Sequence, residues 1–275
     1  MLGGLLVGGP DLQRMETDMN GRIPARSARL AAAILATAAV TAIAAGTASA
    51  EVVYNNIPAT LPGNFASIGL AATSTTEFGG EVELAGTARK NPTVTVVMSS
   101  WACQSGSWNE HDCQLPKSNK GFKVPVTFRV YEAGELKTPI VTKTKSFKMS
   151  YRPAASSKCT GEYAGTWYDE ASKECFNGYA FPISINLRLQ RLPKKAVITV
   201  SYPTSGPSDS LNVAVSEPSE KTLTVGSDPV EEWFANSTWS EMYCPGAKDV
   251  GTLGPEEGTG CQGVNYQPVI AISAL

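Results

Sequence analysis

Apolar side chains alternate with polar ones through most of the chain after residue 51, and this period of two constrains the fold more than any other feature. It is clearest over residues 122–130 and 179–189, where aliphatic and aromatic side chains occupy every second position. Alternation places the two sets of side chains on opposite faces of a β-strand. No segment after residue 51 spaces its apolar residues helically, so we predict an all-β protein.

Turn signals separate the alternating segments and indicate many short strands. They include Pro62-Gly63-Asn64, Gly79-Gly80, Lys90-Asn91-Pro92, Ala133-Gly134, Asn177-Gly178 and Gly206-Pro207. Short strands with such turns are typical of sandwiches and jelly rolls, whereas a parallel sheet would need crossover helices. We therefore predict one antiparallel, jelly-roll-like β-sandwich domain over residues 51–275, with a long decorated loop at about 228–263.

Two prolines lie inside predicted strands and limit where those strands sit. Pro125 and Pro182 both occupy positions in alternating segments. Because proline cannot donate a hydrogen bond to a ladder, we expect each to lie at a sheet edge or a bulge.

The first fifty residues have the organisation of an export signal. Arginines precede an uncharged apolar run over residues 30–45, and Ala48 and Ala50 present small side chains to a signal peptidase. The run is shorter than the about 20 residues that a membrane-spanning helix needs. We predict a secretory signal peptide within residues 1–50, translation starting at Met19 or Met15, and a mature protein that begins at Glu51. No second apolar span follows, so no membrane insertion is expected after cleavage.

All six cysteines follow the predicted cleavage site, which favours disulfides in an exported chain. They form three close sequential couples, each across a polar, turn-rich segment, and we expect the pairings Cys103–Cys113, Cys159–Cys175 and Cys244–Cys261. A zinc site would be the competing use of cysteine. No C-x2-C pair is present and His111 is the single histidine, so we expect no metal at these residues.

The charge balance argues against two classes of partner. The net charge is −2, with acids and bases nearly equal in number. A nucleic-acid partner would require a basic excess, and no basic amphipathic segment suggests binding to a membrane surface.

Several short segments together resemble a family of uncharacterised bacterial secreted proteins. They are Val53-Tyr54-Asn55-Asn56-Ile57-Pro58 with Leu61-Pro62-Gly63-Asn64, Ala72-Thr73-Ser74 with Glu77-Phe78-Gly79, Val94 to Trp101, Ser150-Tyr151-Arg152-Pro153, Cys175-Phe176-Asn177-Gly178 and Ser210-Leu211-Asn212-Val213. The resemblance covers roughly residues 52–216 and implies a secreted, actinobacterial-type, extracellular β-rich protein. Some members of that family carry a C-terminal surface-sorting segment, which this sequence lacks. The resemblance supplies no catalytic residues.

No motif predicts a catalytic centre. His111 lies among acids in the predicted Cys103–Cys113 loop, and no nucleophile-elbow, zinc-protease or phosphate-loop motif is present. A glycosidase needs only two carboxylates, so a polysaccharide-active enzyme stays open as the alternative. The acids available for it are Asp169, Glu170, Glu174, Glu231, Glu232 and Glu241. The same acids could bind Ca²⁺, the one cofactor left open, although no D-x-D-x-D-G loop supports such a site.

Aromatic residues gather beside the cysteines and suggest a binding surface. Trp108, Trp167 and Tyr168 lie in or beside the first two couples, and Trp101 ends a predicted strand. Sugars stack their apolar C–H faces on aromatic rings, while a buried tryptophan packed on a disulfide is the competing interpretation, favoured for Trp101. We expect a non-enzymatic, secreted component of the envelope or matrix that contacts polysaccharide through Trp108, Trp167 and Tyr168.

Overall fold

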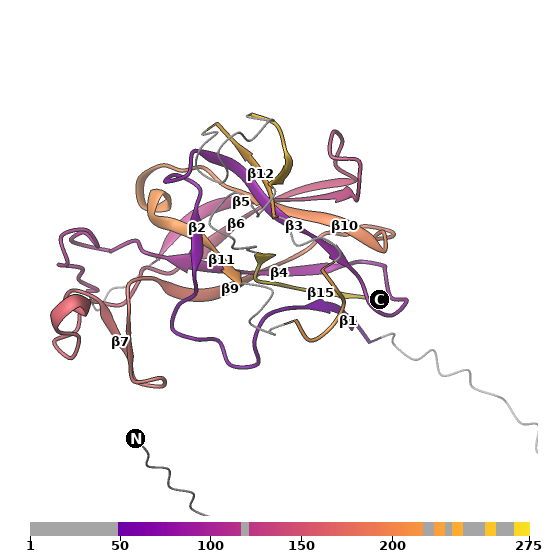
Figure 1. Ribbon diagram of the computed structural model, residues 1–275. Helices are drawn as coiled ribbons and strands as arrows, with labels where there is room; N and C mark the ends of the chain where they lie inside the picture. Colours follow the sequence, from indigo (N-terminus) through magenta and orange to yellow (C-terminus); the bar gives the residue numbers. More distant parts are fainter. Residues whose placement is uncertain (1–48, 117–120, 217–222, 229–232, 239–250, 257–266) are drawn as a thin grey trace, which may run out of the picture. The chain divides into compact units, whose positions relative to one another are not determined.

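The computed structural model describes residues 49–116, 121–216, 223–228, 233–238, 251–256 and 267–275 (Figure 1). The predicted signal peptide and the Cys244–Cys261 pair lie outside these residues. Residues 47–275 form one compact unit. Its described part contains β-strands and two 3₁₀ helices, η1 (Gly161–Tyr163) and η2 (Gly206–Ser210), but no α-helix.

Two antiparallel sheets face each other, which confirms the predicted all-β sandwich. The first sheet has the order β1-β15-β4-β11-β14, with β9 on the free side of β4 and β2 on β11. Its strands are β1 (Glu51–Asn55), β2 (Ser67–Gly69), β4 (Thr93–Ser100), β9 (Tyr179–Asn186), β11 (Leu211–Ser216), β14 (Gln267–Pro268) and β15 (Ile270–Ala274).

The second sheet has the order β13-β12-β3-β10-β5-β6. Its strands are β3 (Thr75–Glu83), β5 (Phe122–Glu132), β6 (Val141–Met149), β10 (Lys195–Ser201), β12 (Trp233–Ser237) and β13 (Gly254–Glu256). A separate hairpin pairs β7 (Trp167–Asp169) with β8 (Glu174–Phe176).

The core lies between the inner faces of the two sheets and follows the predicted alternation. In β5, Val124, Val126, Phe128 and Val130 are buried, whereas Lys123 and Pro125 are exposed. These side chains join buried residues of the neighbouring strand β10, and of β4, β9 and β15 in the facing sheet, in one large apolar cluster. Burial of this alternate set fixes the strand register, because a one-residue slip would turn the whole set toward solvent.

Both prolines lie where a strand lacks a neighbour on one side, as expected. Pro182 is in β9, which pairs with β4 alone among the described strands. Pro125 pairs with Ser146 of β6, and the ladder between β5 and β10 begins only at Thr127. Neither proline therefore deprives a central ladder of a donor.

The segment predicted as a long decorated loop differs from that prediction in its described part. Residues 233–237 form β12, which pairs with β3, and residues 254–256 form β13 on the outer side of β12. Phe234 is buried against Tyr131 and Val197 on the outer face of the second sheet. The strand is too short to show alternation, so its sequence alone did not reveal it.

Candidate functional site

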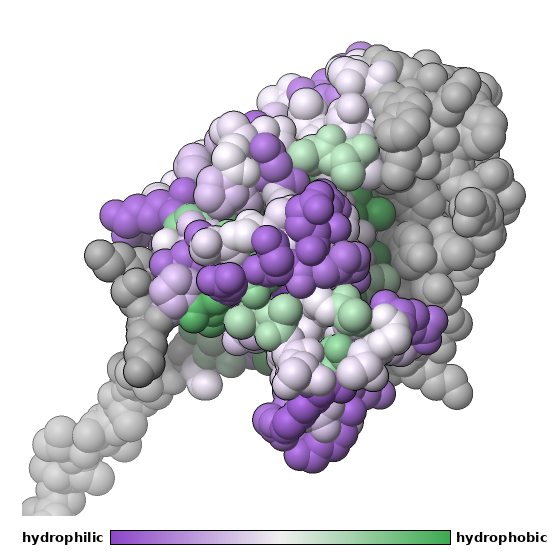
Figure 2. All heavy atoms as spheres, turned by 90° about the vertical axis from the view of Figure 1, so that its left-hand side faces the viewer, coloured by the Kyte–Doolittle hydropathy of each residue, from purple (hydrophilic) through white to green (hydrophobic). Residues whose placement is uncertain are grey.

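Two disulfide-closed loops extend from the same end of the sandwich. The first covers residues 101–116 after β4, and the second covers residues 151–178 between β6 and β9 and contains β7 and β8. The bonds Cys103–Cys113 and Cys159–Cys175 close them, with Cα–Cα distances of 5.2 and 5.9 Å. Both predicted pairings are thus confirmed. Figure 1 shows β7 at this end, and Figure 2 faces it, with hydrophilic surface interrupted by apolar patches.

The two closed loops are packed against each other. The amide of Ala155 donates to the carbonyl of Cys113 at 3.0 Å, which joins one loop to the other through the backbone. Gly165 lies so close to His111 that a Cβ on this glycine would be 2.2 Å from the histidine Cβ. Gly165 also has a φ of +83°, which L side chains rarely adopt. The loops therefore act as one body rather than as independent extensions.

Arg152 lies at the junction and is 0% exposed. Its amide donates to the carbonyl of Ala102, in the first loop, at 2.9 Å. Its side chain donates through Nη2 to Gly165 O at 2.8 Å and through Nε to Pro153 O at 3.3 Å, while Nη1 has no partner. Burial lowers the pKa of Arg152 to about 10. The Arg152 amide thus joins the second loop to the first, while the guanidinium ties carbonyl groups within the second loop and has no carboxylate partner among the described residues.

Trp101 and Trp108 form an aromatic pair in the first loop. Their ring centroids are 4.9 Å apart and their planes meet at 85°, an edge-to-face arrangement. Both side chains are partly exposed. Trp101 Nε1 donates to Ser99 Oγ at 3.2 Å, and Ser99 Oγ donates to Asn64 Oδ1 at 2.6 Å, so the orientation of this indole is fixed. Sequence analysis favoured core packing for Trp101, but the structure leaves part of its ring at the surface beside Trp108.

The turn that carries Trp108 is closed at its base. Asp112 accepts a hydrogen bond from the amide of Ser107 at 2.7 Å, and the amide of His111 donates to the carbonyl of Trp108 at 3.3 Å. His111 is exposed with a φ of +60°, and among the described residues no carboxylate forms a hydrogen bond with its ring. The geometry therefore presents an aromatic side chain on a rigid turn and assigns no catalytic contact to the histidine.

Trp167 and Tyr168, the other predicted ligand residues, occupy different environments. Trp167 is only 6% exposed, donates through Nε1 to Gly178 O at 2.6 Å and packs against Phe176 and Tyr179. It joins the β7–β8 hairpin to the sandwich. Tyr168 is partly exposed, and Lys158 Nζ lies 4.5 Å from its ring centroid. The structure therefore places Trp108 and Tyr168 at the surface and Trp167 inside.

The described acids of the second loop are engaged locally. Glu170 forms ion pairs with Lys158 and Lys173, and both lysines hold the pKa of this exposed carboxyl below its usual range. Asp169 accepts hydrogen bonds from Ser172, which lower its pKa. Among the residues that the structure describes, no three His, Cys, Asp or Glu side chains cluster as a metal would require. Glu231, Glu232 and Glu241 lie outside those residues.

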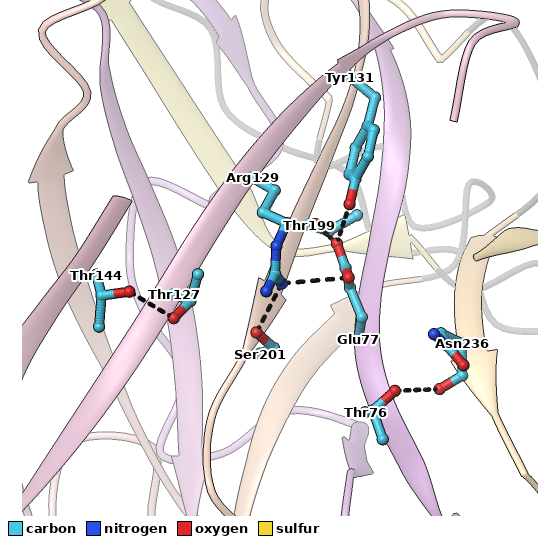
Figure 3. A network of polar contacts seen from close by, with 9 residues as sticks. All are labelled: Thr76, Glu77, Thr127, Arg129, Tyr131, Thr144, Thr199, Ser201 and Asn236. Carbon is cyan, nitrogen blue, oxygen red and sulfur yellow. Dashed lines mark hydrogen bonds and ion pairs between the residues drawn. The ribbon is translucent and has the colours of Figure 1, made fainter. Parts of the chain in front are cut away.

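A second polar cluster, which sequence analysis missed, lies on the outer face of the second sheet. Glu77 is 8% exposed and accepts hydrogen bonds from Tyr131 at 2.9 Å and from the Thr199 hydroxyl. Arg129 pairs with it at 3.2 Å and also donates to Ser201 at 2.9 Å, as Figure 3 shows. Burial raises the pKa of the Tyr131 hydroxyl, and the charge of Glu77 adds to this effect.

The Glu77 cluster is a structural network rather than an acid–base site. Glu77 Oε1 accepts from Tyr131 of β5 and Thr199 of β10, and Oε2 accepts from Arg129 of β5, so the carboxylate ties β3 to its neighbour β10 and to β5 beyond it. The sequence gives only one sign of this cluster, an acid, Glu77, at an outward-facing position of a strand. Its partners Arg129 and Thr199 lie on other strands, and only the fold brings them close to it.

Comparison with protein-family models, curated proteins and solved structures finds no match. Within the described residues, no helix is long and apolar enough to cross a membrane. The two disulfides are consistent with a location outside the reducing cytoplasm.

Proposed function

We propose that this chain is a secreted, non-enzymatic binding protein of the bacterial envelope or matrix that contacts polysaccharide through Trp101 and Trp108. The observation that carries the proposal is the partly exposed edge-to-face pair on a disulfide-closed turn. An aromatic ring held in one orientation offers apolar area to a sugar face at little cost in conformational entropy. The predicted signal peptide and the family resemblance support the same location.

Several contacts favour binding by preorganisation. The Ser99 and Asn64 side chains fix the Trp101 indole, the Asp112 carboxylate closes the turn, and the Cys103–Cys113 bond fixes its base. A surface held this way loses little freedom when a ligand binds. Partly exposed Tyr168 lies in the adjoining loop and offers a further ring.

Binding is favoured over hydrolysis because Asp169 and Glu170, two acids of the second loop, lack the properties of a general acid. A glycosidase needs two carboxyl groups about 5–10 Å apart, one of them with a raised pKa. Here the pKa values of Asp169 and Glu170 are both lowered, by hydroxyl and ammonium partners respectively. Both groups are therefore poor proton donors at neutral pH.

The test is retention of the oxidised full chain, recovered from an exporting host, on a panel of insoluble and envelope polysaccharides. Trp108→Ala is compared with Tyr163→Ala, which removes an aromatic ring that is 51% exposed elsewhere on the closed loops. We expect at least one polysaccharide to retain wild type and Tyr163→Ala, and retention of Trp108→Ala to fall by about tenfold or more, as for a central aromatic contact. Equal retention of all three proteins, or of none, overturns the proposal.

A further inference from the structure

A groove crosses the other end of the sandwich, opposite the closed loops. It consists of three adjoining depressions, with volumes of about 650, 410 and 250 Å³. The largest shares Gly86 and Lys194 with the second, and it shares Thr87, Arg89 and Arg191 with the third. Two turns form most of the walls: residues 84–90 before β4 and residues 190–194 before β10. Because β4 spans eight residues, the groove lies roughly 25 Å from the loop that carries Trp108. Figure 1 shows β7 and the C-terminus at these opposite ends.

The groove carries positive charge that the described acids neutralise only in part. Arg89, Lys90 and Arg191 line it, and none of them has an ion pair with a described carboxylate. Lys194 differs, since it pairs with Glu83 at 2.7 Å. Glu132 is the one acid that lines the largest depression. Four cations line the three depressions in all, against the two acids Glu83 and Glu132, and the Glu51 carboxylate lies next to Gly86.

Arg89 is fixed in place by the backbone rather than by a counter-ion. Its guanidinium donates at 2.6–3.2 Å to the carbonyl oxygens of Leu84, Ala85, Gly86 and Ala88. The amides of Arg89 and Lys90 both donate to the carbonyl of Leu275, at 3.0 and 2.8 Å, which anchors this turn to the end of β15. The charge is thus presented on a rigid wall, whereas Arg191 is exposed and able to reach a ligand.

Apolar side chains lie beside these cations. Ile140 lines the largest depression and Leu275 the smallest, and each is 42% exposed. Exposed apolar side chains next to unpaired cations suit a ligand with both anionic groups and C–H surface. An acidic sugar polymer has both, since its oxyanions recur along a chain of apolar ring faces.

We propose that this groove binds an anionic polysaccharide, whose carboxylate or phosphate groups pair with Arg191 and Lys90. Guanidinium and ammonium groups form charge-assisted hydrogen bonds with either oxyanion. Ile140 and Leu275 pack against the sugar backbone. The site is separate from the aromatic pair and takes ligands of a different charge, so the protein has two glycan-binding ends.

The test measures binding of the oxidised full chain to polygalacturonate, to poly(glycerol phosphate), to neutral dextran and to phosphatidylglycerol vesicles. The variant Lys90→Glu/Arg191→Glu is compared with Lys123→Glu/Lys148→Glu. The control makes the same change in net charge at exposed, mutually paired positions of β5 and β6. Neither variant changes a buried residue, so both should fold as wild type does. Their unfolding free energies are measured first to check this.

We expect one or both anionic polymers to bind, and the polymer preferred identifies the oxyanion. The charge reversal Lys90→Glu/Arg191→Glu should raise the half-saturation concentration of the polymer by about tenfold or more, while the control variant binds as wild type does. Added salt should weaken binding. Binding to neither polymer, equal loss in both variants, or binding to vesicles in place of polymers overturns the proposal. Trp108→Ala should bind the anionic polymers as wild type does, so the outcome is independent of the aromatic pair.

Discussion

Arg152 shows at the residue scale how the closed loops are held together. A fully buried guanidinium bears a large desolvation penalty, which a carboxylate partner normally offsets. Here the side chain donates instead to the carbonyl oxygens of Gly165 and Pro153, which would otherwise lie unsatisfied. The lowered pKa has this burial as its cause. The guanidinium within the Ser150-Tyr151-Arg152-Pro153 segment is therefore an internal tie within the second loop rather than a surface charge, and the Arg152 amide joins that loop to Ala102 of the first.

Arg152→Ala should lower the free energy of unfolding by about 3 kcal/mol, because two buried carbonyl groups lose their donor. Equilibrium denaturation with urea measures the change. Arg188→Ala, at an exposed position after β9, is the matched control and should alter stability little. Equal stability of the two variants would show that the loops do not depend on the buried guanidinium.

Asp228 makes the attachment of residues 223–228 to β1 sensitive to pH. Burial raises the pKa of its carboxyl above the ordinary value, and the hydrogen bond from Tyr54 opposes that shift. The folded protein thus favours the protonated carboxyl. Its contribution to stability is present below the unfolded pKa of about 3.9 and is lost as pH rises through the higher folded value.

Asp228→Asn should remove this loss while keeping an oxygen acceptor for Tyr54. We expect the variant to gain unfolding free energy over wild type as pH rises from about 4 toward neutrality, with a plateau above the folded pKa. Denaturation curves at a series of pH values measure the difference. A difference that stays constant, or shrinks as pH rises, would contradict the assignment.

At the element scale, strands with regular alternation were predictable, including the six-residue β11, whereas β12 and the pairing of β14 were not. The segments of β5 and β9 were evident, because burial of one face selects apolar residues at every second position. The two-residue β14 and the five-residue β12 are too short to carry a period. Their pairing depends on neighbours that are distant in sequence, so no local pattern revealed it.

Lysines on the inner side of β6 protect the free edge of β9. Lys143 Nζ donates to Asn186 O at 2.7 Å and Lys145 Nζ to Ser184 O at 3.3 Å. Edge strands with unpaired carbonyl groups invite pairing with other chains, and inward-pointing lysines are a known protection. These contacts also draw the two sheets together where β6 meets β9.

Lys143→Ala/Lys145→Ala should therefore expose the edge of β9. We expect a fall of about 1 kcal/mol in unfolding free energy and concentration-dependent self-association, detected by sedimentation velocity. Lys148→Ala, an exposed lysine on the same strand that contacts no carbonyl of β9, is the control. A double variant that stays monomeric and as stable as the control would rule out this role.

The Cys159–Cys175 bond closes the longer of the two described loops, with a sequence separation of 16. Loop closure of this size contributes about 3 kcal/mol in the chain-entropy model. Cys159→Ser/Cys175→Ser should lower stability by about that amount and speed tryptic cleavage at Lys158 and Lys173, both of which are exposed. Cleavage at the wild-type rate would mean that Trp167 packing alone holds the hairpin.

On the scale of the whole molecule, sequence predicted the sandwich and two disulfides but only part of the site. Cysteine spacing and a period of two are local signals, which explains their success. Whether a tryptophan is buried depends on the residues that pack over it, which a local pattern does not show. For this reason the sequence did not distinguish the buried Trp167 from the partly exposed Trp108. The basic groove joins two turns about 100 residues apart, each with few charges, so neither turn alone indicated a site.

The arrangement places an aromatic surface and a basic groove at opposite ends of one rigid sandwich. The shared strands β4, β5 and β9 connect the two ends, since each begins at one and finishes at the other. The two proposed sites would hold two glycan chains apart at a fixed distance. An enzyme, in contrast, needs its groups to converge on one bond.

The central claim is that Trp108 contacts polysaccharide, and affinity electrophoresis tests it most directly. Wild type, Trp108→Ala and Tyr163→Ala are run in native gels with and without each soluble neutral polysaccharide. We predict that one polysaccharide slows wild type and Tyr163→Ala, while Trp108→Ala migrates as it does in the empty gel. If all three proteins migrate alike in every gel, the closed loops do not form a polysaccharide-binding surface.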